Sequence, residues 1–420
     1  MKRIICLISL ALFFCLNAMS EEVSIREFKL PETKSDNMNL YLDLNYSGTD
    51  SMNFIGDFSL QYSKFYSSLP FSYYLYSELS NDGDFTTRFY ENGKKTVYDR
   101  LSFVIVSSLE KYWSDESMFF LGGKFSTNFG SNVNYSEHLG SITNESNLGI
   151  GGGYGRTYDA SGMAEALRIQ EYLLSENLIS DEFSKEIILD IAVHCTKINE
   201  YAQKYYAKHP INWYQDLEQI LIRSGKLNSQ NLNPYALFRV SEVLNRERIH
   251  QKIIGWKLGA YFAFSNYTYF YDTYFYDKYY DENDYDYNYP NTEKIGGDLN
   301  FEIGYPINNK LHFYHNTTYS YKVDTDFLDE SQNIINTNSS LTYNFTNLFD
   351  FEIKHQLRTY NVIKSTVSEQ KLTFDAYYYL ENNVFLRLSM GLNNYTSDYG
   401  NPKRDYIKKE IALYFGYRFF

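Results

Sequence analysis

Histidines are the side chains of this sequence best suited to acid–base or metal chemistry, but their spacing supports neither. The seven histidines are scattered along the chain, and we find no local Ser/His or Asp/His group that resembles a hydrolase site. His312 and His315 would point to opposite faces of a strand, so they cannot form a metal-binding pair. We therefore expect no catalytic residue, no cofactor and no metal site, and we expect the protein not to be an enzyme.

A second candidate is the glycine-rich segment from Gly149 to Arg156. It is not a phosphate-binding loop, because Tyr154 occupies the position of the final glycine and no Lys-Ser/Thr pair follows. If the segment is a strand, four of its glycines share one face: Gly149, Gly151, Gly153 and Gly155. Missing side chains there favour either close packing or clearance inside a pore.

A third candidate is the tract from Tyr267 to Tyr289, where tyrosines are mixed with the acids Asp272, Asp277, Asp281, Glu282, Asp284 and Asp286. Carboxylates at this density could hold Ca²⁺, but the spacing and the missing glycine do not match an EF-hand loop. A solvated external loop is the simplest interpretation. Binding of a sugar or of another surface is the functional alternative.

Any site must be positioned by the strands that the sequence predicts. Apolar and polar residues alternate with a period of two in many segments, which is typical of strands with one apolar face and one face in contact with water. It is clearest in the segments 384–392 and 349–359, where Leu388 and Ile353 lie on apolar faces and Ser389 and Lys354 on polar ones. The pattern recurs towards both ends of the chain. It predicts an all-β transmembrane antiparallel barrel of about 14 strands (range 12–16), with six strands before a helical insert and eight after it.

The polar faces of these strands carry charges of both signs, which indicates a water-filled interior with ion pairs across its wall. Lys257 belongs to this set, and the lumen-facing candidates are Asp43, Asp57, Glu78, Lys124, Glu302, Asp350, Glu352, Lys354, Arg358, Arg387 and Arg418. A barrel of about 14 strands is intermediate between filled small barrels and open porins. The wall therefore permits a pore without requiring one.

Composition and the N-terminus place the chain outside the cytoplasm. Residues 1–20 form a predicted signal peptide: Lys2 and Arg3 precede an apolar stretch, and Ala18-Met19-Ser20 offers a cleavage site before Glu21. The rest has no apolar run of helical membrane-spanning length, although 19% of residues are aromatic. The net charge of −13 gives no support for nucleic-acid binding. Cys195 is the only cysteine after cleavage, so no intramolecular disulfide is possible, and we interpret it as a small core residue.

The last ten residues, Ile411 to Phe420, alternate and end in aromatic residues. This end resembles the C-terminal signature of Gram-negative outer-membrane β-barrels of the porin-like kind, although the alternation ends on Phe419 and leaves Phe420 as an extra aromatic residue. The resemblance implies a bacterial outer-membrane location, contact with outer-membrane lipid, and recognition of the last strand by the barrel-assembly machinery. The aromatic residues expected at the membrane interfaces are Trp256, Tyr417, Phe419 and Phe420.

Between strands six and seven the period changes to about 3.6 residues, which predicts an α-helical insert over residues 159–252. We predict four helices: one capped by Ser161, one from Ser180 to Ala207 that ends at His209-Pro210, one from Trp213 to Ser224, and one opened by Asn233-Pro234. The barrel strands then occupy residues 21–158 and 253–420. Because six crossings precede the insert, an N-terminus in the periplasm places the insert there too.

Two functional hypotheses remain open. The first is passage of small solutes through a porin-like barrel, with the periplasmic helices gating it or docking a periplasmic protein partner. The second is a non-conducting surface-binding or scaffold barrel that uses adhesin-like external loops. No residue pattern in the sequence identifies the solute or the partner.

Overall fold

The computed structural model describes residues 23–28, 31–48, 52–87, 95–134, 139–229, 231–247, 251–272, 292–325, 331–346, 349–362, 365–381, 384–397 and 404–417. The predicted signal peptide, Phe419, Phe420, Arg418 and most of the Tyr/Asp tract lie outside these ranges.

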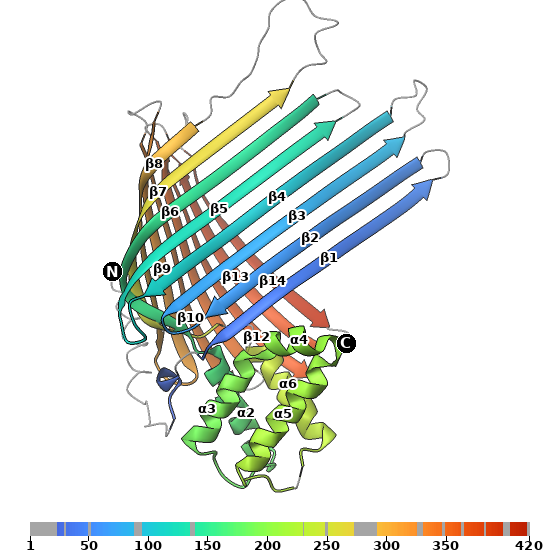
Figure 1. Cartoon of the computed structure of the whole chain (residues 1–420), viewed down its shortest axis with the longest axis vertical. Coiled ribbons are helices and arrows are strands. Elements are labelled where there is room, and N and C mark those ends of the chain that lie inside the picture. The colour runs from blue at the N-terminus through green and yellow to red at the C-terminus, as the bar shows by residue number, and fades with distance from the viewer. Residues whose placement is uncertain are drawn as a thin grey trace, which may run out of the picture.

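A single sheet of 14 antiparallel strands forms most of the molecule and curls so that β1 to β6 face β9 to β14 in Figure 1. The strands follow chain order and pair only with their sequence neighbours among the described residues. They are β1 (Thr33–Gly48), β2 (Met52–Ser67), β3 (Phe71–Thr87), β4 (Lys95–Tyr112), β5 (Phe119–Asn134), β6 (Leu139–Asp159), β7 (Ile253–Asp272), β8 (Thr292–Pro306), β9 (Leu311–Asp324), β10 (Ser331–Thr346), β11 (Phe349–Val362), β12 (Ser365–Glu381), β13 (Val384–Ser397) and β14 (Arg404–Tyr417). The predicted barrel architecture, with six strands before the helices and eight after them, is confirmed.

The strand register divides the side chains into two continuous faces, because residues paired across an antiparallel ladder point the same way. One face carries the large apolar residues, many of them exposed in this isolated chain, such as Leu40 at 65%, Phe262 at 62% and Leu413 at 72%. Such a surface is stable only against hydrocarbon, so this is the lipid-facing side.

The opposite face is the concave one. Lys257 on β7 contacts Glu110 on β4 although β5 and β6 lie between them, and Lys322 on β9 similarly contacts Asn147 on β6. Side chains can span non-neighbouring strands in this way only on the inside of a curved sheet. The polar face is therefore the interior.

Connections between strands differ between the two ends of the sheet. At one end β8 and β9 are separated by residues 307–310, and β2 and β3 by residues 68–70. At the other end β7 and β8 are separated by residues 273–291. At that same end β3 continues to Thr87 and β4 begins at Lys95.

The helices lie at the end of the sheet with the short turns (Figure 1). They are α2 (Ser161–Ser175), α3 (Lys185–Thr196), α4 (Ile198–Tyr205), α5 (His209–Arg223) and α6 (Pro234–Glu247), with a 3-10 turn η2 (Tyr206–Lys208) between α4 and α5. Within the described residues, no helix is long and apolar enough to cross a membrane.

Several predicted helix boundaries were wrong. Ser161 is the first residue of α2 and does not cap it. The Ser161 hydroxyl accepts a hydrogen bond from the backbone N–H of Lys252, and the backbone N–H of Ser161 donates to the Asp159 carboxylate. Ser180 and Asp181 do not start a helix because both bind Lys226, so α3 begins after Ser184. The long second helix is also divided into α3 and α4.

The His209-Pro210 pair begins α5 instead of ending the previous helix, since proline is tolerated in a first turn. Two predicted helix ends agree with the structure. Asn233 caps α6 by accepting from Ala236 N, and Gly225 after α5 has a positive φ of 66°.

The helical domain has its own apolar core, which includes Trp213, Leu217, Ile188 and Cys195. It also includes residues far away in sequence. Val23, Ile25 and Phe28, around the short 3-10 helix η1 (Ile25–Glu27), are buried in the same core. Arg26 donates to Pro306 O, at the end of β8, at 2.7 Å, so the N-terminal segment joins the helices to the sheet.

His194 lies in this core against Trp213, with ring centroids 4.6 Å apart. Its Nε2 is 2.9 Å from the carbonyl oxygen of Trp213; because a carbonyl only accepts, this nitrogen carries the proton. Burial lowers the pKa of His194 from its ordinary value, since the core disfavours the imidazolium.

This burial predicts a pH dependence of stability. Below about pH 6.5 the unfolded chain binds a proton that the folded His194 does not, so stability falls on acidification, by at most about 1.4 kcal/mol per pH unit. Helix unfolding followed by circular dichroism from pH 7 to pH 5 should show this loss. His194→Gln should make the dependence shallower. An unchanged slope in His194→Gln would contradict the assignment.

Candidate functional site

The interior face of the sheet is the candidate site, because the register brings the predicted lumen-facing residues onto it. Asp43 is paired with Asp57 across β1 and β2, and Lys257 is paired with Glu302 across β7 and β8. Because paired residues point to the same side, the registers of the successive strand pairs place both pairs on one continuous face. The others on that face are Glu78, Lys124, Asp350, Glu352, Lys354, Arg358 and Arg387. Arg418 lies outside the described residues.

An ion-pair network centred on Lys257 connects β4, β7 and β8. Its Nζ lies 2.9 Å from Glu110 Oε1 and 3.7 Å from Glu302 Oε2. Tyr314 and Thr157 donate to the two oxygens of Glu302, each at 3.1 Å. The three charged side chains are only about one-fifth exposed, so they compensate each other where water is scarce.

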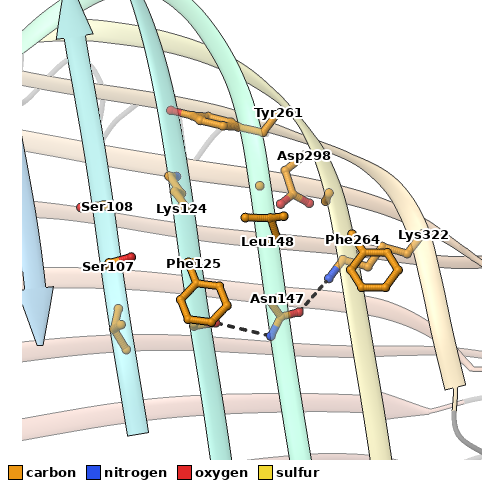
Figure 2. A pocket seen from close by; sticks show the side chains of 14 residues that line it. Ser107, Ser108, Lys124, Phe125, Asn147, Leu148, Tyr261, Phe264, Asp298 and Lys322 are labelled. Carbon is orange, nitrogen blue, oxygen red and sulfur yellow. Dashed lines mark hydrogen bonds between the residues drawn. The ribbon is translucent and has the colours of Figure 1, made fainter. Parts of the chain in front are cut away.

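A pocket of about 370 Å³ opens on the interior wall of β4 to β9 (Figure 2). Lys322 Nζ donates to Asn147 Oδ1 at 3.3 Å, and Asn147 in turn donates to Ser126 Oγ at 3.5 Å. Lys124 Nζ lies 4.6 Å from the centre of the Tyr261 ring, a cation–π distance. The pocket therefore presents two ammonium groups among hydroxyl and amide groups.

Asp298 supplies a negative charge to the same pocket, and its Oδ1 is buried without a hydrogen-bond partner. Neither Lys124 nor Lys322 has a carboxylate oxygen within 4.0 Å in the part of the chain that the structure describes. The pocket can thus attract an anionic or zwitterionic solute, while Asp298 limits how strongly an anion is held.

The Tyr261 ring lies against glycines of the interior wall. A Cβ added at Gly122 would lie 3.3 Å from the ring, and one at Gly259 would lie 2.9 Å from it. Gly151 and Gly153 approach neighbouring backbone so closely that a Cβ would lie 2.0 Å from a carbonyl oxygen. Of the two predicted roles for the glycines, close packing is the one that the structure shows at these positions.

Further ion pairs line the opposite wall. Arg387 binds Asp375 at 3.0 Å and lies over the Tyr377 ring, while Lys354 binds Glu352 at 2.7 Å. On β3, Glu78 accepts from Tyr76, Gln61 and Ser59. Interior carboxylates are thus mostly held by neighbours on the wall.

Sequence reasoning missed four interior residues: Glu110, Tyr261, Asp298 and Lys322. The alternation within β8 and β9 could have placed Asp298 and Lys322 on the interior face. Asp298 precedes outward-facing Leu299, and Lys322 follows outward-facing Tyr321. Glu110 lies near the end of β4, where the alternation of types is less regular.

The predicted interface aromatic residues are placed only in part. Trp256 lies on the lipid-facing side, 40% exposed and against Tyr154, with ring centroids 5.7 Å apart. Tyr417 belongs to β14, and Phe419 and Phe420 lie outside the described residues.

Among the residues that the structure describes, no three His, Cys, Asp or Glu side chains converge as metal ligands would. Many of the interior charges are paired with one another or hydrogen-bonded to neutral groups, as Lys257, Arg387 and Glu78 are. This chemistry suits solvation of a passing solute.

The sequence matches no protein-family description and no curated protein. A comparison with solved structures pairs the chain with OpdQ of Pseudomonas aeruginosa, at 9% identity and a TM-score of 0.20. It also pairs the chain with a BenF-like porin from Pseudomonas fluorescens Pf-5, at 8% identity and a TM-score of 0.22. Each alignment covers 92% of this chain and 99% of the other. At such TM-scores the spatial agreement is slight, and the fold assignment rests on the strand pairing.

The fold and its two faces define the class of protein. Fourteen antiparallel strands with an apolar outer face and a charged concave face form the wall of a porin-like transmembrane β-barrel. A helical domain is inserted between β6 and β7.

Proposed function

We propose that this protein is a bacterial outer-membrane pore for small polar solutes. The observation that carries the proposal is the continuous interior face, on which charges of both signs extend from β1 to β13. Charged groups at such density would be costly in a sealed apolar core, whereas they are well solvated along a water-filled passage.

The two lysines of the interior pocket favour a weak preference for anions. Lys124 and Lys322 are not neutralised by adjacent carboxylates in the described strands, whereas Lys257 is. An unneutralised ammonium group on the wall of an enclosed passage attracts anions more strongly than one exposed to bulk water.

Conductance in planar bilayers tests the pore. The purified chain should give stepwise single-channel currents, and the double variant Lys124→Glu/Lys322→Glu should move the reversal potential in a salt gradient towards cation selectivity. The variant Lys64→Glu reverses a lipid-side charge and serves as a matched control with unchanged selectivity. A correctly folded protein that gives no currents would contradict the pore and favour a scaffold or surface-binding role.

We further propose that the helical domain restricts the periplasmic entrance of the pore. The support is its attachment at several strands. Lys252, 1% exposed, donates to Asn344 of β10 at 2.7 Å, and Asn344 donates to Asp350 of β11. Lys310 in the β8–β9 turn binds Glu171 of α2 at 2.9 Å.

Glu200 of α4 accepts from the backbone N–H of Lys34 on β1, at 3.1 Å. The domain is thus attached to β1 and to β8–β11 at once, across the same end of the sheet. An object held at both sides of an opening narrows it. These attachments use the side of the helical domain that faces the sheet. We propose that the opposite side docks a periplasmic protein partner.

Reversing the charge of one attachment tests this restriction. Glu171→Lys places three cations together, because Arg168 and Lys310 both bind Glu171 now. The half-exposed Lys310–Glu171 ion pair contributes less than about 1 kcal/mol to stability, so the main effect of the substitution is repulsion among the three cations. We expect longer or larger openings in Glu171→Lys, with recovery on adding Lys310→Glu.

Asp190→Lys is the control, because it breaks the Asp190–Arg223 pair inside the helical domain and leaves the attachment intact. If the length and size of the channel openings are the same in all of these variants, the proposed restriction is contradicted, whereas the proposal that the protein is a pore is not.

A further inference from the structure

The lipid-facing side of β5 to β8 is hollowed near the end of the sheet with the short turns. A groove of about 600 Å³ lies there, and the side chains that line it include Leu121, Leu258 and Leu299. These three leucines are between 48% and 61% exposed, so the groove opens towards hydrocarbon and not towards the interior. We refer to it as the outer groove.

The outer groove is present because two small residues lie side by side among larger ones. Gly152 of β6 is paired with Ala260 of β7, and Leu121 and Leu299 flank this pair on β5 and β8. A Cβ added at Gly152 would lie 2.5 Å from the backbone oxygen of Phe120, so a larger residue there would move the sheet. The packing of the backbone therefore keeps the floor of the groove free of side chains.

Aromatic rings form the end of the outer groove that is nearest to the β4–β5 turn. Phe119 and Tyr154 are in edge contact, with ring centroids 4.8 Å apart, and the Trp256 ring lies 5.7 Å from that of Tyr154. Trp113, in the turn, lines the same groove and is 85% exposed. Amphipathic rings are favoured at the level of the lipid headgroups, so the groove begins at the membrane surface and extends into the hydrocarbon.

A lysine lies beside this end of the groove, on the same side of the sheet. Lys111 of β4 is paired with Leu121, so both side chains point outwards, with their Cβ atoms about 5 Å apart. Lys111 is exposed, and in the described part of the chain no carboxylate oxygen lies within 4.0 Å of its ammonium group. A cation on the lipid-facing side, two residues before the turn, is at the depth of lipid phosphates.

We propose that Lys111 and the outer groove form a binding site for one glycerophospholipid of the adjacent leaflet. The lipid phosphate accepts a charge-assisted hydrogen bond from the Lys111 ammonium group. One acyl chain lies in the outer groove over Gly152 and Ala260, where it contacts the flanking leucines. A positive charge at the membrane surface and an apolar groove that extends inwards from it match the two parts of a phospholipid.

This site goes beyond the proposed pore and depends only on the transmembrane fold. The absence of channel currents would therefore not affect it.

Native mass spectrometry of the full-length protein tests the site. The delipidated protein in detergent is titrated with dioleoyl phosphatidylethanolamine, or with dioleoylglycerol, which has the same acyl chains and no phosphate. We expect one phosphatidylethanolamine to bind at concentrations at which dioleoylglycerol does not. Lys111→Gln should weaken this binding about tenfold, because one charge-assisted hydrogen bond is lost. Ala260→Phe should abolish it, because the new ring occupies the groove. Ala260→Leu replaces that variant if the ring prevents folding.

Two matched variants change the same residue types elsewhere on the lipid-facing side. Lys64→Gln removes an outward lysine of β2, and Ala376→Phe adds a ring on β12, where Ala376 is paired with outward Leu388. Both should bind phosphatidylethanolamine as the unchanged protein does, with equal strand content by circular dichroism.

Three outcomes would overturn the proposal. Equal lipid binding by all of the variants would leave only the unspecific lipid layer around the barrel. Equal binding of the two lipids, with no effect of Lys111→Gln, would overturn the phosphate contact. Protein dimers that Ala260→Phe dissociates would make the outer groove a contact between two copies of the chain.

Discussion

The need to pair every backbone N–H and C=O away from water determines this molecule. In hydrocarbon each unpaired group costs several kcal/mol, and the antiparallel ladders on both sides of β2 to β13 satisfy these groups along those strands. The ladder fixes a side-chain period of two, so each strand presents one face to lipid and one to the interior. A shift of one residue would turn Leu388 inwards and Arg387 into lipid. The register is therefore set by the difference between two solvents.

The interior follows from the same constraint, since charges excluded from lipid accumulate on one wall and must compensate each other. Lys257 does so with Glu110 and Glu302, and Arg387 does so with Asp375. Compensation is incomplete at Lys124 and Lys322, which line the interior pocket, and the proposed preference for anions depends on these two lysines. The helical domain depends on the sheet in turn, because its core includes Ile25 and Phe28 next to the first strand.

Alternation in the sequence was sufficient to predict the strands, their faces and the place of the helices, because a period of two is unambiguous where one face meets hydrocarbon. The start of α3 was missed because Asp181, a good helix-capping residue, binds Lys226, 45 residues further along. The Lys257–Glu110 pair was missed because it joins strands that are not neighbours.

The central claim is that one face of the sheet meets lipid and the other meets water. Single spin labels placed along β13 in the reconstituted, otherwise cysteine-free protein test it most directly. Oxygen, which partitions into lipid, should reach Leu386, Leu388, Met390 and Leu392, and a water-soluble nickel chelate should reach Arg387, Ser389 and Gly391. Accessibility that does not alternate with a period of two, or that alternates in the opposite sense, would contradict the account.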